Sequence, residues 1–380
     1  MKVLHVVPTL TKKADGVSVF VKNLANNTFN KVSDLRIATL ENEFEVNNYP
    51  ILNFKRDTLF FRLGISLKLK KWCKLNNGNF NIVHNHGLWM MPNIYVALLL
   101  KNKSTKLIIS PHGALSDWAF KRNNFVKKIF WLLFQKKVLQ KASVFHATSI
   151  QEYNDIRRHG FIQPICIIPI GIDLSDFPEK KIVESKEFLY LARIHPVKGI
   201  DTLLHAWKIL ENDNKYWSLR IVGPDTDSYS KKMKKLAINL NLKRVYFNGP
   251  LYDTYKVSAY QNAEVYILPT RSENFGLTVL ESLASNTPVI VTKAAPWYDI
   301  EESSAGWWIE EGITPLVNAL KKIMTLDTFE LYKMGSNGRL LAEQKFSWEI
   351  ISNDFVKVYN WLINNDIRPS SIRTSTKYEK

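Results

Sequence analysis

Short apolar runs alternate with longer amphipathic segments along most of this chain. The apolar runs predict buried strands at 2–7, 34–39, 81–85, 106–110, 143–147, 165–169, 187–192, 217–222, 244–247, 263–268 and 288–292. The segments between them repeat apolar residues at helical spacing and predict helices at 17–28, 58–76, 90–101, 123–140, 149–159, 198–211, 229–241, 252–262, 275–285, 314–325, 328–345 and 347–363. Strand–helix alternation of this kind is typical of an α/β fold, in which helices cover both faces of a parallel sheet.

The alternation is interrupted near the middle of the chain, where Pro169 and Gly171 are followed by the polar run 176–186. A chain of 380 residues is long for one domain, so we expect two doubly wound, Rossmann-like domains. The first is expected over 1–175 and the second over 176–345. A helix at 346–365 is expected to pack back toward the N-terminal domain, and the polar residues 366–380 to form a flexible tail.

Charge separates the two halves. The net charge is +17, and residues 1–180 hold 26 Lys and Arg against 12 Asp and Glu, whereas residues 181–380 hold 26 against 23. The basic half is expected to meet an anionic surface. No stretch approaches the roughly 18 apolar residues of a membrane-spanning helix, and the only two cysteines, Cys73 and Cys166, form no CxxC pair. A reducing, cytoplasmic location is expected.

The segment 121–141 mixes aromatic and aliphatic residues with lysines. Its apolar arc is too wide for one helix face, and Lys127, Lys128, Lys136 and Lys137 flank it. Part of the segment serves the core, and we expect the rest to touch an anionic membrane surface, with help from the basic helix 58–76. The protein would then be peripheral on the inner face of the plasma membrane.

Two glutamates, Glu273 and Glu281, stand eight positions apart where a strand is followed by a helix. Gly276 lies between them and permits a close approach of a phosphate or of another backbone. The first N–H groups of the helix favour an anion, and carboxylates accept hydrogen bonds from hydroxyls. This arrangement favours a ligand that joins a phosphate to polyhydroxylated groups, bound at the carboxyl edge of a parallel sheet.

Arg193 and Lys198 follow the first strand of the second domain. Two cations at a strand end, with a helix after them, favour a phosphate clamp, and a solvated loop with surface charges is the alternative.

The Arg-x4-Lys-Gly loop and the Glu-x7-Glu segment together resemble the retaining nucleotide-sugar glycosyltransferases of family 4. The resemblance implies the GT-B fold, in which two Rossmann-like domains face each other across a cleft. Other segments fit the same family, namely Asp15-Gly16-Val17, Ser110-Pro111-His112-Gly113-Ala114-Leu115, Ala147-Thr148-Ser149 with Glu152, residues 168–173, Pro288-Val289-Ile290 and Pro296-Trp297. The resemblance covers residues 1–345 and is greatest to bacterial polysaccharide and surface-glycan transferases, including those of lipopolysaccharide and capsule synthesis.

The resemblance implies a hexosyltransferase that moves a sugar from a nucleoside diphosphate, UDP or GDP, to a glycan or lipid-linked saccharide. Arg193 and Lys198 would stabilise the leaving diphosphate, assisted by the N–H groups at Asn274, Phe275, Gly276 and Leu277 and by Gly16. Glu281 would bind the ribose, Glu273 the donor sugar, and His112 the donor sugar and the transfer zone. Same-face attack with retention is implied. No cofactor or metal is expected, because Arg193 and Lys198 already neutralise the leaving group.

The sequence departs from the family at three positions. Asp15 precedes a single Gly16 where relatives carry two glycines, Ile170 stands where Asn is common, and Asn286 stands where Gly is common. The first departure concerns the donor-phosphate contacts, and the other two concern structure.

Two further motifs imitate metal sites. Asp225-Thr226-Asp227 resembles a DxD metal site, but it lies in a turn-rich loop far from the other motifs and favours an Asx-type turn. His84 and His86 lie on one face of a strand, and with no third ligand apparent they favour an acceptor-side or structural role.

Four other functions remain possible at this point. They are a nucleotide-sugar epimerase, a sugar-phosphate-forming transferase, a non-catalytic nucleotide-sugar binder and a nucleic-acid-binding protein. The last is suggested by the charge alone, and no helix-turn-helix, RRM or KH signature accompanies it, so no nucleic-acid partner is expected.

Overall fold

A computed structural model describes residues 1–11, 16–57, 61–100, 104–121, 124–182 and 184–375. The chain divides into two compact units, one formed by 1–171 with 348–380 and the other by 172–347. Each unit is built around a mostly parallel sheet, so both have the α/β architecture that the alternating pattern predicts.

The described part of the first unit holds an eight-stranded sheet in the order β14-β7-β6-β5-β4-β1-β2-β3. Its strands are β1 (Lys2–Val6), β2 (Asp34–Thr39), β3 (Ile51–Asn53), β4 (Ile82–His86), β5 (Lys106–Ser110), β6 (Val144–Ala147), β7 (Ile165–Ile167) and β14 (Ile372–Arg373). They pair in parallel, except that β14 joins β7 antiparallel. The strand order reverses between β1 and β4, which is where open sheets of this kind bind ligands.

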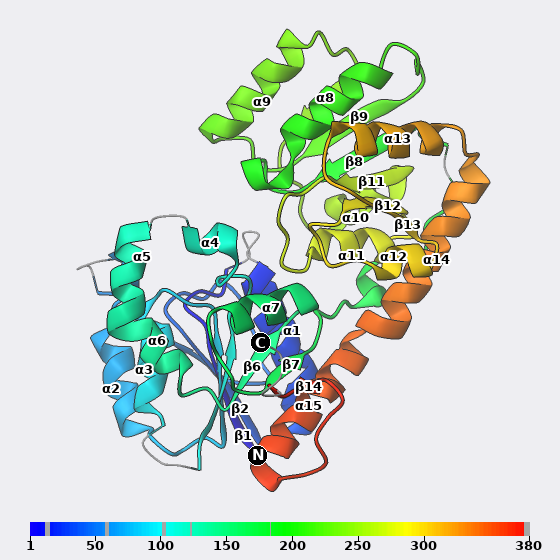
Figure 1. Ribbon diagram of the computed structural model, residues 1–380. Helices are drawn as coiled ribbons and strands as arrows, with labels where there is room; N and C mark the ends of the chain where they lie inside the picture. The colour runs from blue at the N-terminus through cyan, green and yellow to red at the C-terminus, as the bar shows by residue number, and fades with distance from the viewer. Residues whose placement is uncertain (12–15, 58–60, 101–103, 122–123, 183, 376–380) are drawn as a thin grey trace. The chain divides into compact units, whose positions relative to one another are not determined.

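Two apolar cores lie on the two faces of this sheet (Figure 1). One face is covered by α1 (Gly16–Thr28) and α15 (Trp348–Asn364), which pack against each other around Phe20 and Phe355. The other face carries α2 (Leu67–Leu75), α3 (Met91–Tyr95), α6 (Lys136–Leu139) and α7 (Ile150–Arg158). The remaining helical segments are α4 (Asp117–Lys121), α5 (Asn124–Phe130), the π-helical turn η4 (Trp131–Gln135) and the short turns η1 (Phe29–Lys31), η2 (Phe61–Leu63) and η3 (Val96–Leu98).

The second unit holds a parallel six-stranded sheet over its described residues, in the order β10-β9-β8-β11-β12-β13. The strands are β8 (Glu187–Leu191), β9 (Ser218–Val222), β10 (Val245–Asn248), β11 (Val265–Leu268), β12 (Val289–Thr292) and β13 (Gly306–Ile309). The order reverses between β8 and β11, so this unit too has a switch point at its centre.

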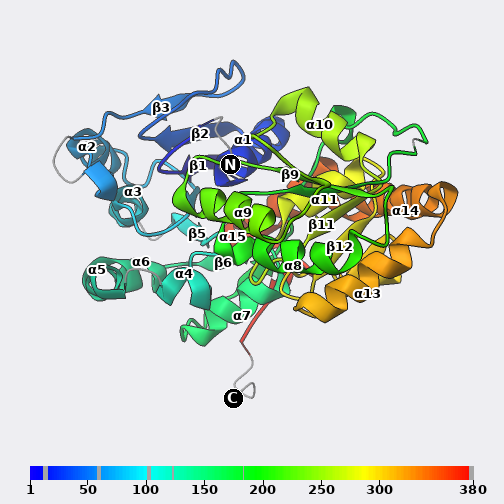
Figure 2. The same cartoon turned by 90° about the horizontal axis from the view of Figure 1, so that it is seen from above.

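Figure 2 shows α8 (Ile200–Leu210) and α13 (Ile313–Met324) on one side of this sheet, and α10 (Asp253–Asn262) and α14 (Thr328–Phe346) on the other. The helix α8 packs against α13 and α9 (Ser228–Asn239), and α14 packs against α11 (Leu277–Ala284). The short segments are α12 (Asp299–Glu302), η5 (Leu174–Asp176) and η6 (Pro196–Lys198).

Three of the expected helices differ from the pattern. The helix expected at 90–101 is divided into α3 and the 3₁₀ turn η3, and residue 101 lies outside the described residues. Of the helix expected at 58–76, residues 58–60 lie outside the described residues, and α2 begins at Leu67 because Gly64 has a left-handed φ of 63° and Ser66 caps the helix by accepting from the Leu69 N–H. The helix expected at 123–140 is interrupted by the π-helical turn η4. Hydrophobic periodicity is judged over many residues, so it does not reveal such local breaks and predicts one continuous helix.

Five short elements carry too little pattern to be predicted. These are β3, β13, β14, α4 and α12, of at most five residues each. The strand β14 lies in the polar stretch after residue 365 and pairs Ile372 with Cys166. Pairing with an edge strand and burial of Ile372 order this stretch, and neither is visible in its composition.

Candidate active site

Two loops meet at the switch point of the second unit, one after β8 and one after β11. The carbonyl of Val197 accepts hydrogen bonds from the Arg271 N–H at 2.7 Å and from the Thr270 hydroxyl at 3.0 Å. The Arg271 guanidinium also donates to the Pro196 carbonyl at 2.6 Å and pairs with Asp201 at 2.8 Å. These contacts fasten the two loops to each other and fix the residues between them.

Gly199 allows α8 to begin directly against the end of β11. Its φ is 68°, and a Cβ at this position would lie 1.8 Å from the Pro269 carbonyl oxygen. Only glycine fits such an approach without displacing backbone. The glycine of the Arg-x4-Lys-Gly motif therefore has a packing role that places Lys198 beside the β11 loop.

Lys198 and Glu273 face each other across these loops and form an ion pair. Each side chain is 14% exposed, so the pair is partly desolvated and still reachable from outside. The Glu273 N–H donates to the Ala294 carbonyl at 3.1 Å, which fixes the backbone of this residue to the β12 loop. The two motif residues expected to act together are thus in direct contact.

The helix α11 begins just after Glu273. Gly276 precedes it with a φ of 91°, and the first N–H groups of a helix have no partner inside the helix. The Asn274 N–H donates to the Glu273 carboxylate at 3.2 Å. The Phe275 ring is buried against Trp297, whose indole N–H donates to the Phe275 carbonyl at 2.5 Å, so this side chain anchors the loop. Leu277 is the first residue of α11.

Glu281 lies on α11, one turn further in, and is 8% exposed. It accepts from the Lys256 ammonium at 2.5 Å and from the Tyr260 hydroxyl at 3.0 Å, both on α10. Burial, with the Glu281 charge as a second cause, raises the pKa of Tyr260 well above its usual range, so its hydroxyl stays a donor. Lys256 and Tyr260 are not predicted from the sequence, because no motif marks residues that reach the site from a helix elsewhere in the chain.

Arg193 is the second residue after the end of β8 and is exposed at this edge. Its carbonyl accepts from the buried Tyr190 hydroxyl at 3.2 Å. Arg193 and Lys198 therefore lie on one loop, as the sequence predicts. Glu273 pairs with Lys198, whereas among the described residues Arg193 pairs with neither glutamate.

In the first unit, His112 stands at the carboxyl end of β5 with a left-handed φ of 53°. The buried carboxylate of Glu152, on α7, accepts from the Gly113 N–H at 2.7 Å and from the Thr148 N–H at 2.8 Å. This carboxylate fixes the turn that presents His112. Burial, with the His146 charge as a lesser cause, lowers the pKa of His112 to about 3, so the ring is neutral near pH 7.

Gly16 begins α1, which follows β1 on the other side of the switch point from β4. A Cβ built at Gly16 would meet no described atom within 4 Å, so packing gives no reason for a glycine there. Its neighbour Asp15 lies outside the described residues. Phe20, one turn into α1, contacts His112 edge-on at 5.1 Å between ring centroids, and so the helix start and His112 share one sheet edge.

Comparisons with known proteins identify the family of this chain. The model described as "Glycosyl transferases group 1" matches residues 172–340, and "Glycosyltransferase Family 4" matches residues 5–176. Together they cover residues 5–340. The chain belongs to the group 1, family 4 glycosyltransferases.

Individual relatives of this glycosyltransferase are distant. The chain is 25% identical over 234 residues to the MMP alpha-(1->4)-mannosyltransferase of Mycolicibacterium hassiacum, covering 59% of this chain and 56% of that protein. It is 27% identical over 247 residues to the capsular polysaccharide biosynthesis glycosyltransferase CapM of Staphylococcus aureus, covering 59% and 64%. The chain thus spans little more than half the length of these curated relatives.

Solved structures support the GT-B fold of this glycosyltransferase. HepE of Anabaena, determined in complex with UDP-glucose, superposes with a TM-score of 0.75 at 16% identity, covering 94% of this chain and 99% of that one. At this identity the likeness concerns the fold alone.

The Asp225-Thr226-Asp227 motif of this glycosyltransferase has a structural role. The Asp227 carboxylate caps α9 by accepting from the Ser230 N–H at 2.7 Å, and Asp225 pairs with Lys234 at 2.5 Å. The expected turn is therefore a helix cap.

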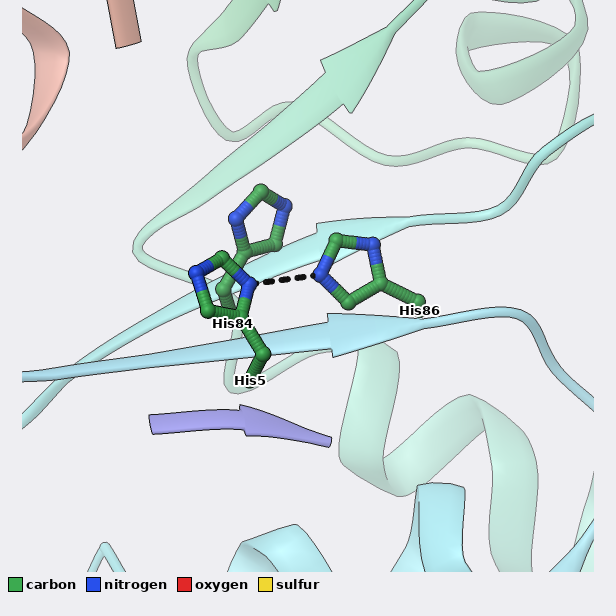
Figure 3. A group of neighbouring side chains, drawn as sticks. All are labelled: His5, His84 and His86. Carbon is green, nitrogen blue, oxygen red and sulfur yellow. Dashed lines mark hydrogen bonds between the residues drawn. The ribbon is translucent and has the colours of Figure 1, made fainter. Parts of the chain in front are cut away.

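The His84–His86 pair is not isolated, which differs from the sequence analysis. His5, on the neighbouring strand β1, is in register with His84 and brings a third buried imidazole (Figure 3). One nitrogen from each of these three rings lies within 4.8 Å of the others. The signal was present as a single histidine in the first apolar run, but only strand pairing brings it to β4.

Proposed function

We propose that this glycosyltransferase moves a hexose from a nucleoside diphosphate to a glycan or lipid-linked saccharide, with retention of the anomeric configuration. The observation that carries this proposal is the Lys198–Glu273 pair at the switch point between β8 and β11. A cation for phosphate and a carboxylate for hydroxyls are the two groups that a nucleotide sugar needs.

Each side chain has a part in the proposed reaction. Arg193 and Lys198 stabilise the charge that develops on the departing diphosphate, helped by the N–H groups at the start of α11. Glu273 holds hydroxyls of the donor sugar, and Glu281 holds the ribose. On the other unit, His112 contacts the donor sugar, and the departing phosphate takes the proton of the acceptor hydroxyl. No divalent metal is needed, because two cations already balance the leaving group.

The relatives suggest a donor and a pathway to test. HepE was crystallised with UDP-glucose, so a UDP-sugar is the first donor to test. CapM is named for capsular polysaccharide biosynthesis, which supports a role in surface-glycan synthesis for this chain.

An exposed apolar face supports a peripheral membrane location. No helix among the described residues is long and apolar enough to cross a bilayer. However, the segment from α5 to α6 exposes apolar side chains beside exposed lysines, namely Ile129, Leu132, Leu133 and Phe134 with Lys128, Lys136 and Lys137. Apolar insertion combined with cationic flanks is typical of binding to anionic lipid. The basic helix α2 lies on the same face of the sheet (Figure 1).

The activity is tested by measuring thermal shifts with UDP-, GDP- and ADP-sugars, followed by turnover of the stabilising donor. Release of nucleoside diphosphate that depends on a saccharide acceptor, with an α-linked product from an α-linked donor, is the expected result. Turnover without any acceptor would indicate an epimerase or a hydrolase instead. Undiminished turnover in excess EDTA is expected, and loss of turnover would contradict the metal-independent mechanism.

Membrane contact is tested by sedimentation with vesicles. We expect binding to vesicles with anionic lipid, weakened at least severalfold by replacing Leu132 and Leu133 with Gln. Ile162, which is 75% exposed elsewhere in the same unit, gives a matched control when it is replaced with Gln. Equal binding to neutral and anionic vesicles would exclude the electrostatic part of the proposal.

A further inference from the structure

Five of the eight histidines of this chain are gathered at the switch point of the first sheet. They are His5 on β1, His84 and His86 on β4, His112 after β5 and His146 on β6. Burial lowers the pKa of every one of them, to about 3 for His5 and to about 4 for His146. Neutral imidazoles each carry a single N–H, so their hydrogen bonds must have a direction.

One series of hydrogen bonds runs through His146 and His84, and the acceptor at its end fixes which group donates in each bond. The Ile168 carbonyl can only accept, so Nε2 of His146 donates to it at 2.8 Å, and Nδ1 of His146 must accept from the Ser110 hydroxyl at 2.8 Å. The Ser110 oxygen then accepts from Nε2 of His84 at 2.7 Å, and Nδ1 of His84 accepts from the Tyr359 hydroxyl at 3.0 Å. Both nitrogens of His84 are thereby used in the fold.

A second series of hydrogen bonds leads from His5 through His86 to His112. Nδ1 of His5 lies 2.9 Å from Nε2 of His86 (Figure 3), and Nδ1 of His86 lies 3.2 Å from Nε2 of His112. The other nitrogen of His5 is on the far side of its ring, is buried, and has no partner among the described groups.

The unpartnered Nε2 atom of His5 decides which group donates in each bond of the second series. If His112 donated to His86, and His86 to His5, the far nitrogen of His5 would carry a buried N–H without an acceptor. In the opposite direction that nitrogen keeps only a lone pair. Buried unpaired N–H groups are the rarer of the two in folded proteins, which favours donation from His5 to His86 and from His86 to His112.

We infer that His86, supported by His5, is a positioning residue that holds the proton of His112 on Nδ1, so that His112 meets its substrate as a hydrogen-bond donor. The Nε2 atom of His112 is occupied by the His86 N–H, and the rings of the two residues are stacked at 17°. The Glu152 carboxylate fixes the backbone of the same turn. The inference rests on the proposed function for the identity of the substrate, a donor sugar rich in hydroxyl oxygens, but the tautomer of His112 does not depend on it.

The tautomer is measured directly by ¹⁵N-resolved NMR of the imidazole rings in the full-length protein. We expect a protonated Nδ1 and an unprotonated Nε2 at His112 near pH 7. Protonation at Nε2 of His112 overturns the inference, whether or not the protein transfers sugar. Displacement of the His5 and His86 signals by equimolar Zn²⁺ also overturns it, since a metal would then take the nitrogens that form the chain.

The role in turnover is tested with two variants of His86. The variant His86→Phe keeps a ring in the stack and removes both nitrogens, and we expect kcat to fall about tenfold, as for one lost hydrogen bond, with KM for the donor within about twofold. The variant His86→Gln retains a donor and is expected to restore most of kcat. The exposed His205 on α8, replaced with Gln, is the control. An unchanged kcat in a folded His86→Phe variant contradicts the positioning role, and if that variant does not fold, the wild-type tautomer decides.

Discussion

The Lys198 ammonium, in the turn after β8, is paired with the Glu273 carboxylate, in the loop after β11, although the two residues are 75 positions apart in sequence. The pair is only 14% exposed on either side, so each charge compensates the other until a ligand arrives. In the proposed reaction, the cation would turn to the diphosphate of the donor and the carboxylate to the sugar hydroxyls.

Removing either partner of this pair should therefore impair transfer. We expect Lys198→Ala and Glu273→Ala each to lower kcat by well over tenfold, because in the proposed reaction Lys198 stabilises charge on the donor and Glu273 binds its hydroxyls. Initial rates of nucleoside diphosphate release measure this. The exposed pair Lys293–Glu310 in the same unit is a matched control, and Lys293→Ala should leave the rate unchanged. Normal turnover in either site variant would mean that the site is elsewhere.

Gly199 should tolerate no side chain. We expect Gly199→Ala to lower the free energy of unfolding of the second unit by at least about 2 kcal/mol, because the left-handed φ is strained and the new Cβ would meet the Pro269 carbonyl. Urea unfolding followed by tryptophan fluorescence measures the change. Gly249→Ala in the same unit is the control, since a Cβ there meets no described atom within 4 Å. Equal stability of the two variants would show that the α8 start can move.

The clearest sequence signals were those that repeat or that stand close together in the chain. Eleven strands were predicted within a few residues, because buried strands form continuous apolar runs. The Glu273 to Leu277 loop was placed correctly after β11, because strand, glycine and helix start are consecutive in sequence.

Contacts between distant segments gave no sequence signal. Lys256 and Tyr260 reach Glu281 from α10, and His5 reaches His86 from β1, only because tertiary packing brings those elements together. The role of Asp227 as a cap also needed the backbone of α9, although its position before a helix was visible.

The buried histidines should make the first unit sensitive to acid. The pKa values are lowered in the folded state, to about 3 for His5 and His112 and about 4 for His146, whereas an unfolded histidine titrates near 6.5. Below about pH 6.5 the unfolded chain binds more protons, so stability is complete above that pH and is lost as the pH falls toward 4. Each such histidine contributes about 1.4 kcal/mol per pH unit in this window.

One group opposes this trend, because burial raises the pKa of Asp155 to about 6, and its contribution is lost as the pH rises through that value. The net effect is still a fall in stability on acidification. Urea midpoints of the first unit at pH 7.5, 6 and 5 measure it, and His205→Gln should show the same slope as the unaltered protein. A midpoint that does not change over this range would mean that the histidines are hydrated.

The Asp225-Thr226-Asp227 sequence should be dispensable for chemistry. We expect Asp227→Ala to cost about 1 kcal/mol of stability through loss of the α9 cap and to leave kcat unchanged. Thermal unfolding and initial rates measure the two effects, and Asp225→Asn should leave both nearly unchanged because its partner Lys234 is a surface contact. A large loss of turnover in either variant, reversed by added Mn²⁺, would restore the metal interpretation.

The second unit begins and ends at one place. The Ile172 N–H donates to the Phe346 carbonyl at 2.7 Å, and Ile172 also forms a bridge with Ser347, whereas α15 belongs to the first unit. In topological terms the second unit is inserted into the sequence of the first, and its first and last residues are joined by backbone contacts. A polypeptide of residues 172–347 would accordingly have neighbouring ends, which a short loop could join into a circle without disturbing the strand order of its sheet.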